Sequence, residues 1–206
     1  MKVLFAHGFE GAPDGGKPTY MREELGWDVV APVMSDNGWN IEQQTSVLLE
    51  LIDAGEFDLV AGSSMGGLAA ANASQLRPGA KFGLLLIAPA FGLEEMWDDR
   101  LSPDEMKHWE ASNAYQYRGF ELEMILGWDF METAKQMSWP KLNHPTVILH
   151  GKQDDVVPIE HSRIIAEREA NVIAMKEVED GHRMQQSKTY FSKAAELCLN
   201  SQTRQK

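Results

Sequence analysis

The stretch Asp58-Leu-Val-Ala-Gly-Ser-Ser-Met-Gly-Gly-Leu-Ala69 joins an apolar run to a helix-forming run, with Gly62-x-Ser64-x-Gly66 between them. A Gly-x-Ser-x-Gly sequence at a strand-to-helix turn holds its serine in a strained, outward-facing conformation, and the glycines let neighbouring backbone pass close by. The unpaired N–H groups and the positive dipole end of the following helix favour a negative charge beside the serine. The stretch therefore predicts a strand, a tight turn that presents Ser64, and a helix.

Apolar runs alternate with amphipathic runs along the rest of the chain. The apolar runs predict strands at Lys2–Ala6, Asp28–Val33, Phe57–Ala61, Phe82–Ala88, Thr146–His150 and Val172–Val178. The intervening runs predict helices at Thr19–Leu25, Ile41–Ala54, Leu68–Gln75, Ile159–Glu169 and Ser187–Leu199. Strands that alternate with crossover helices form a mainly parallel sheet with helices on both faces. We therefore expect a three-layer α/β fold.

Length and composition limit the possible functions. A chain of 206 residues with 43% hydrophobic content can bury one sizeable core, so we expect residues 1–206 to form a single domain. The net charge of −12, without a cluster of Lys and Arg, argues against binding to nucleic acid. Cys198 is the only cysteine, which excludes an intrachain disulfide. The apolar run at the N-terminus is too short for a signal peptide or a membrane span, so we expect a cytoplasmic protein.

An insertion of about fifty residues, from Phe91 to Leu142, separates the fourth predicted strand from the fifth. It carries four of the six tryptophans. Its large aromatic and methionine residues include Met96, Trp97, Trp109, Tyr115, Tyr117, Phe120, Met124, Trp128, Phe130, Met131, Met137 and Trp139. Most of these are expected to form the core of a small helical subdomain, and some are expected to face a cleft.

Two loops are expected to face each other across the crevice at the carboxyl ends of the strands. One is His7-Gly8-Phe9, after the first strand, and the other is the turn around Ser64. The backbone N–H groups of Phe9 and Met65 would then form an oxyanion hole, which stabilises a carbonyl oxygen as it becomes negative. His7 precedes its turn, and we expect it to anchor the loop.

A serine hydroxyl needs a histidine that accepts its proton and an acid that orients the histidine. Two adjacent aspartates, Asp154 and Asp155, follow the fifth predicted strand, and His182 lies on the loop after the sixth. None of the other histidines in the second half of the chain has an equivalent position; they are His108, His144, His150 and His161.

Four sequence features in matching order make the chain resemble the α/β-hydrolase superfamily. They are Gly62-x-Ser64-x-Gly66, His7-Gly8-Phe9, His150-Gly-x-x-Asp154-x-x-Val157-Pro158 and Gly181-His182. The double aspartate and His182-Arg183-Met184 look like the short esterases and acyl-protein thioesterases of the depalmitoylase-like branch. The resemblance implies a sheet of about six strands in the order 2-1-3-4-5-6, with the insertion at about 91–142 as a helical lid. It also implies that Asp154 is the acid of the triad.

These features predict a serine hydrolase that cleaves a small carboxylic ester or thioester through an acyl-enzyme on Ser64. His182 would act as general base and then acid, and Asp154 would hold its tautomer. No metal ion or organic cofactor is expected. Two alternatives remain open. The same fold and triad could cleave C–C bonds or lactones, or the chain could be a non-enzymatic binding module with a hydrolase-like fold.

The insertion also suggests a substrate class. Its methionines and aromatic rings would line an apolar pocket, which predicts an apolar acyl group. Its carboxylates are expected to disfavour anionic substrates. They include Glu94, Glu95, Asp98, Asp99, Asp104 and Glu105.

Overall fold

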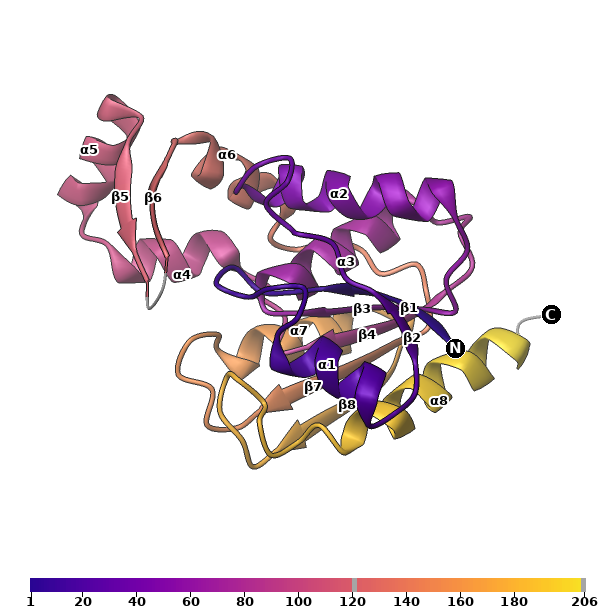
Figure 1. The fold of residues 1–206 in the computed structure, drawn as a ribbon. Helices are drawn as coiled ribbons and strands as arrows, with labels where there is room; N and C mark the ends of the chain where they lie inside the picture. The colour runs from indigo at the N-terminus through magenta and orange to yellow at the C-terminus, as the bar shows by residue number, and fades with distance from the viewer. Residues whose placement is uncertain (120–121, 205–206) are drawn as a thin grey trace.

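A six-stranded parallel sheet forms the centre of the computed structural model, which describes residues 1–119 and 122–204 (Figure 1). Its strands are β1 (Lys2–Ala6), β2 (Asp28–Val30), β3 (Leu59–Ser63), β4 (Gly83–Ile87), β7 (Thr146–Gly151) and β8 (Val172–Val178). They lie in the order β2-β1-β3-β4-β7-β8. Since β7 and β8 are the fifth and sixth predicted strands, the expected neighbours are confirmed. The insertion between β4 and β7 contains two further strands that we did not predict.

Helices cover both faces of the sheet, as the alternation of side chains along each strand requires. On one face, Val3 and Phe5 of β1 belong to the same core as α1 (Gly16–Glu23) and α8 (Tyr190–Arg204). On the other face, Leu4 and Ala6 of β1 belong to a second core. Three helices that contribute to that core are α2 (Ile41–Ala54), α3 (Met65–Leu76) and α7 (Ile159–Arg168).

The helix after the Ser64 turn starts earlier than predicted. We expected it at Leu68–Gln75, and Gly66 and Gly67 do lower helix propensity. The structure begins α3 at Met65, directly after Ser64. Tertiary contacts outweigh propensity here, since residues 65–74 are all buried. As a consequence, the unpaired N–H groups of the first helical turn lie beside Ser64.

The insertion is not wholly helical, which corrects our prediction. It contains α4 (Leu93–Arg100), α5 (Pro103–Ser112), β5 (Tyr115–Arg118), β6 (Glu123–Leu126) and α6 (Asp129–Met137). The strands β5 and β6 pair antiparallel.

Alternating burial explains this hairpin. In β6, Leu126 is 2% exposed whereas its neighbour Ile125 is 66% exposed. Trp109 is buried against the hairpin, and its Nε1 donates to the carbonyl oxygen of Leu126 at 2.9 Å. Aromatic residues at alternate positions favour a strand that is buried on one side. Of the aromatic residues named above, Phe120 lies outside the described residues. Figure 1 shows the insertion beyond the carboxyl ends of the central strands, at the left of the view.

Candidate active site

Ser64 has the backbone conformation that its glycine-flanked turn predicts. Its φ of 56° and ψ of −125° lie in a region that residues other than glycine rarely occupy. Both flanking glycines are required by their surroundings. A Cβ atom at Gly62 would collide with the backbone of Gly66, and one at Gly66 would collide with the carbonyl groups of Ala6 and His7. The sharp turn between β3 and α3 is therefore possible only with these glycines.

We expect Gly66→Ala to lower the free energy of unfolding by about 3 kcal/mol or more, because backbone cannot yield as a flexible side chain can. The matched control is Gly79→Ala, since a Cβ at Gly79 would meet no atom within 4 Å. That variant is expected to stay within about 1 kcal/mol of the wild type. Urea unfolding measures both values. Similar losses in the two variants would contradict the packing described for the turn.

Three side chains that follow different strands form a continuous chain of contacts. Ser64 follows β3, Asp154 follows β7, and His182 follows β8. The Nε2 atom of His182 lies 3.0 Å from the hydroxyl oxygen of Ser64. The Nδ1 atom of the same ring lies 2.8 Å from Oδ2 of Asp154. Both distances are within hydrogen-bond range. The structure thus brings together all three residues that the sequence nominated.

Asp154 is held as a buried carboxylate. Its side chain is fully buried, and Oδ1 accepts the backbone N–H groups of Val156 and Val157 at 2.9 and 2.8 Å. Burial raises its pKa, but contacts with His150 and His182 lower it more strongly, so the pKa lies well below its usual range. Asp154 therefore carries a negative charge at neutral pH. Its neighbour Asp155 is exposed.

His150 is a second histidine partner of Asp154, a role that we did not predict from the sequence. The ring is 0% exposed. Its Nε2 atom lies 3.2 Å from Oδ2 of Asp154 and 3.1 Å from the carbonyl oxygen of Val157. Its Nδ1 atom lies 2.7 Å from the hydroxyl of Ser162. One signal in the sequence could have predicted this contact. His150 and Asp154 are only four residues apart, on either side of the end of one strand.

Asp180 organises the loop that carries His182, and it too was missed. Its carboxylate is 6% exposed. Oδ1 accepts the N–H of Gly181 at 2.9 Å, and Oδ2 accepts the N–H groups of Gln186 and Ser187 at 2.8 and 2.9 Å. One side chain thus joins the beginning of the loop to its end. An aspartate two residues before His182 was the signal in the sequence.

The two predicted oxyanion donors lie at the same cavity as Ser64, since Phe9 and Met65 both line it. Neither backbone N–H has an acceptor among the residues that the structure describes. Gly8 packs tightly here, because a Cβ at this position would lie 3.1 Å from Cβ of Ser64. The assignment of these two N–H groups as an oxyanion hole stays a prediction.

His7 anchors its loop, as predicted. Its Nε2 atom accepts the backbone N–H of Met34 at 3.1 Å, and its Nδ1 atom donates to the carbonyl of Gly8 at 2.8 Å. Burial lowers its pKa, which favours the neutral ring that this arrangement requires.

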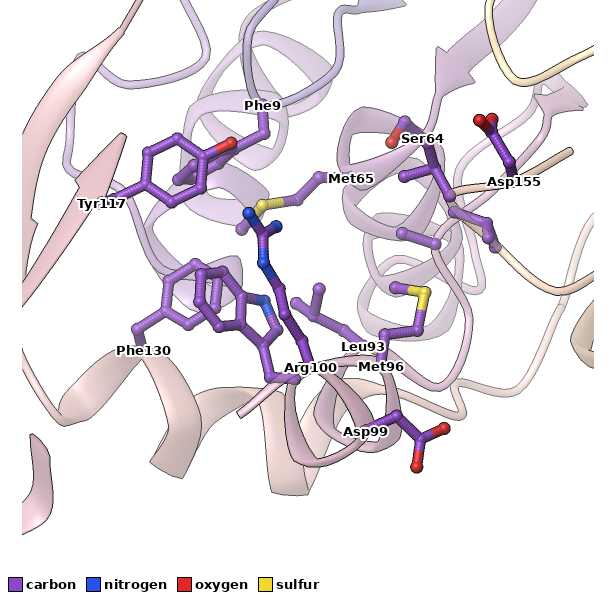
Figure 2. Close-up of a pocket in the computed structure, with 14 residues that line it drawn as sticks. Phe9, Ser64, Met65, Leu93, Met96, Asp99, Arg100, Tyr117, Phe130 and Asp155 are labelled. Carbon is purple, nitrogen blue, oxygen red and sulfur yellow. The ribbon is translucent and has the colours of Figure 1, made fainter. Parts of the chain in front are cut away.

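A cavity of about 440 Å³ adjoins Ser64 (Figure 2). The insertion supplies part of its wall, from α4, β5 and α6. Most of its lining is apolar and consists of Phe9, Met65, Ala90, Leu93, Met96, Trp97, Phe130, Val156 and Val157. Of the six insertion carboxylates named above, only Asp99 lines this cavity, which also receives Arg100. The other five carboxylates lie outside this lining, and the expectation that they disfavour anionic substrates stays a prediction.

Two features are absent from the part of the chain that the structure describes. No group of three His, Cys, Asp or Glu side chains there is arranged to hold a metal ion. No helix within the same residues is long and apolar enough to cross a membrane.

Solved structures with the same fold are distant in sequence. Est1E from Butyrivibrio proteoclasticus is 18% identical, with a TM-score of 0.72 over 98% of this chain and 88% of that chain. Alpha/beta hydrolase domain-containing protein 10 from mouse is 18% identical, with a TM-score of 0.68 over 99% and 88%. The esterase domain of a Rhodothermus marinus protein is 15% identical, with a TM-score of 0.61 over 98% and 85%. The fold is therefore that of the α/β hydrolases.

Comparison by sequence identifies a family. No protein with a curated function matches the chain at a significant level. The model of the family described as "Uncharacterised protein family (UPF0227)" matches residues 2–198. Because this match covers nearly all of the 206 residues, the protein belongs to the UPF0227 family.

Proposed function

We propose that this protein is a serine hydrolase that cleaves a carboxylic ester or thioester through an acyl-enzyme on Ser64. The observation that carries the proposal is the contact chain from Ser64 through His182 to the buried carboxylate of Asp154. Three residues joined by two contacts in this order are the arrangement that activates a serine hydroxyl. A non-enzymatic binding module would not need them.

The reaction proceeds in two steps. The hydroxyl oxygen of Ser64 attacks the acyl carbon while its proton passes to Nε2 of His182. The tetrahedral intermediate collapses as His182 gives that proton to the departing alcohol or thiol, which leaves an acyl ester on Ser64. A water molecule then attacks the acyl carbon and loses a proton to His182. The carboxylic acid leaves as Ser64 regains its proton.

Backbone and side-chain groups around the triad stabilise its charges. The N–H groups of Phe9 and Met65 hold the negative oxygen of each tetrahedral intermediate. Asp154 stabilises the positive charge that forms on His182. His150 and Asp180 act through other residues, since His150 fixes the carboxylate of Asp154 and Asp180 fixes the His182 loop.

The insertion acts as a lid over the nucleophile and determines the acyl group. Leu93, Met96 and Trp97 of α4 line the cavity together with Ser64. Methionine and aromatic side chains suit an apolar ligand. The site therefore takes an acyl group longer than acetate.

We expect catalytic efficiency to rise with acyl length. On p-nitrophenyl esters with two to eight carbon atoms in the acyl group, kcat/KM is expected to increase several-fold overall. Each methylene that enters the cavity contributes up to about 0.8 kcal/mol. Initial rates of p-nitrophenol release give the values. A flat or falling series would contradict the apolar acyl site and leave the triad unaffected, whereas an absence of turnover on every ester and thioester tested would contradict the proposed reaction.

A further inference from the structure

Arg100 places a positive charge in the wall of an otherwise largely apolar cavity. It is the last residue of α4, and its side chain lines the cavity with Ser64. The guanidinium carbon lies 5.5 Å from the centre of the Trp97 ring and 5.9 Å from that of Tyr117. Figure 2 shows the guanidinium directed toward Met65 and Phe9, into the cavity. The two rings thus hold the cation in place.

Within the described part of the chain, this cation forms no ion pair. Two carboxylates, Asp99 and Asp155, share the cavity wall. In Figure 2, Asp99 points away from the guanidinium, and Asp155 lies on the far side of Ser64. A third carboxylate, that of Glu10, is bound by the neighbour of Arg100, because its Oε1 accepts the hydroxyl of Tyr117 at 2.9 Å. The planar donors of Arg100 therefore have no carboxylate at ion-pair distance in the described structure.

The position on α4 offers a simpler explanation for a basic residue, because a cation in the last turn of a helix is favoured by the helix dipole. That explanation does not require a guanidinium directed into a cavity. The lid provides a comparison in Arg118 of β5, which faces solvent with a side chain 73% exposed and approaches Glu123 at 3.8 Å. Both arginines are exposed. Arg100 differs from Arg118 because it lies beside two aromatic rings and lines the same cavity as Ser64.

We propose that Arg100 binds a carboxylate carried by the substrate. The inference rests on the proposed function, and it reverses our expectation that anionic substrates are disfavoured. A guanidinium pairs with a carboxylate through two parallel hydrogen bonds, and the neighbouring rings of Trp97 and Tyr117 orient the guanidinium for such a pair. The apolar lining accommodates the part of the substrate between the scissile bond and the carboxylate. The substrate is an ester or thioester with an apolar body and a remote carboxylate.

Matched substrate pairs test this assignment, with the carboxylate on either side of the scissile bond. On the acyl side, the p-nitrophenyl half-ester of adipic acid is compared with p-nitrophenyl hexanoate. On the alcohol side, the butyrate ester of 6-hydroxyhexanoic acid is compared with hexyl butyrate, by titration of released acid. The measured quantity is the ratio of kcat/KM for the carboxylated ester to that for the neutral ester. The proteins are wild type, Arg100→Gln, Arg100→Lys and the control Arg118→Gln.

In one of the two pairs, Arg100→Gln is expected to lower this ratio about tenfold or more, because a charge-assisted hydrogen bond is lost. Arg100→Lys should retain part of it, and Arg118→Gln should change it less than about twofold, because Arg118 does not line the cavity with Ser64. The pair that responds identifies the side on which the carboxylate lies. Ratios unaffected by Arg100→Gln in both pairs would overturn the inference, and so would an equal fall in Arg118→Gln.

The neutral esters separate this inference from the proposed function. Turnover of neutral esters with ratios insensitive to Arg100 would refute only the role of Arg100. An absence of turnover on all four esters, in protein shown by circular dichroism to be folded, would refute the proposed ester hydrolysis itself.

Discussion

Replacing Ser64 with alanine is expected to lower kcat on a p-nitrophenyl ester by about a million-fold, since the covalent route is lost with the nucleophile. The hydroxyl of Ser64 is the one that lies 3.0 Å from Nε2 of His182. The fold should persist, because the substitution removes one oxygen atom and keeps the Cβ atom. Steady-state kinetics on freshly purified variants, with circular dichroism as the check on folding, measure the effect.

Ser63 provides a matched control in the adjacent position. It ends β3, pairs with Ile87 of β4, and is 5% exposed. Ser63→Ala is expected to retain activity within about tenfold of the wild type, because its hydroxyl has no contact with His182 among the described residues. If Ser64→Ala retained more than a small fraction of wild-type activity after contaminating esterases were excluded, the nucleophile assignment would be wrong.

Asp154→Asn is expected to lower turnover by about ten-thousand-fold. Asparagine can donate its NH₂ group to Nδ1 of His182, which would leave Nε2 protonated and unable to accept the proton of Ser64. The aspartate instead accepts from Nδ1, and hydrogen bonds hold its pKa well below the usual range. Steady-state kinetics at several pH values between 6 and 9 should show the loss throughout, since Asp154 is ionised over that whole range in the wild type.

Asp155→Asn removes the same charge from the next residue and serves as the comparison. The side chain of Asp155 is exposed at the cavity wall, whereas that of Asp154 is fully buried. We expect less than a tenfold effect from Asp155→Asn, because surface substitutions outside a buried network have small consequences. Equal damage from both substitutions would show that the carboxylate of Asp154 does not orient His182.

The main sheet could be predicted because its signals are local. Runs such as Lys2–Ala6 and Val172–Val178 are strands with the predicted bounds. The turn at Ser64 could be predicted because only glycine fits at Gly62 and Gly66. A short pattern of residue types was therefore sufficient for the turn at Ser64, whereas the order of the strands followed from the resemblance to the α/β hydrolases.

The insertion was harder to predict because its structure depends on contacts across the sequence. In β5 and β6, the hairpin is stabilised by Trp109, whose Nε1 reaches a carbonyl 17 residues away. Aromatic residues at close spacing suit the core of a helical subdomain as well as one face of a hairpin, so composition alone did not distinguish these structures.

Three contacts at the site depend on folded geometry in the same way. His150 touches Asp154 only because the loop after β7 turns back on itself, which the two N–H bonds to Oδ1 bring about. Asp180 joins backbone groups up to seven residues apart. Arg100 lies in the cavity wall whereas the acidic residues around it in α4 lie mostly elsewhere, and helix rotation decides which face is turned inward.

The proposal that Ser64 is an activated nucleophile can be tested most directly with a fluorophosphonate probe. The wild-type protein is treated at neutral pH, its intact mass is measured, and the modified residue is located by peptide fragmentation. We predict one probe adduct for each chain, located on Ser64, and no adduct in Ser64→Ala while Ser63→Ala still reacts. An unmodified folded wild-type protein, or an adduct on a residue other than Ser64, would contradict this mechanism.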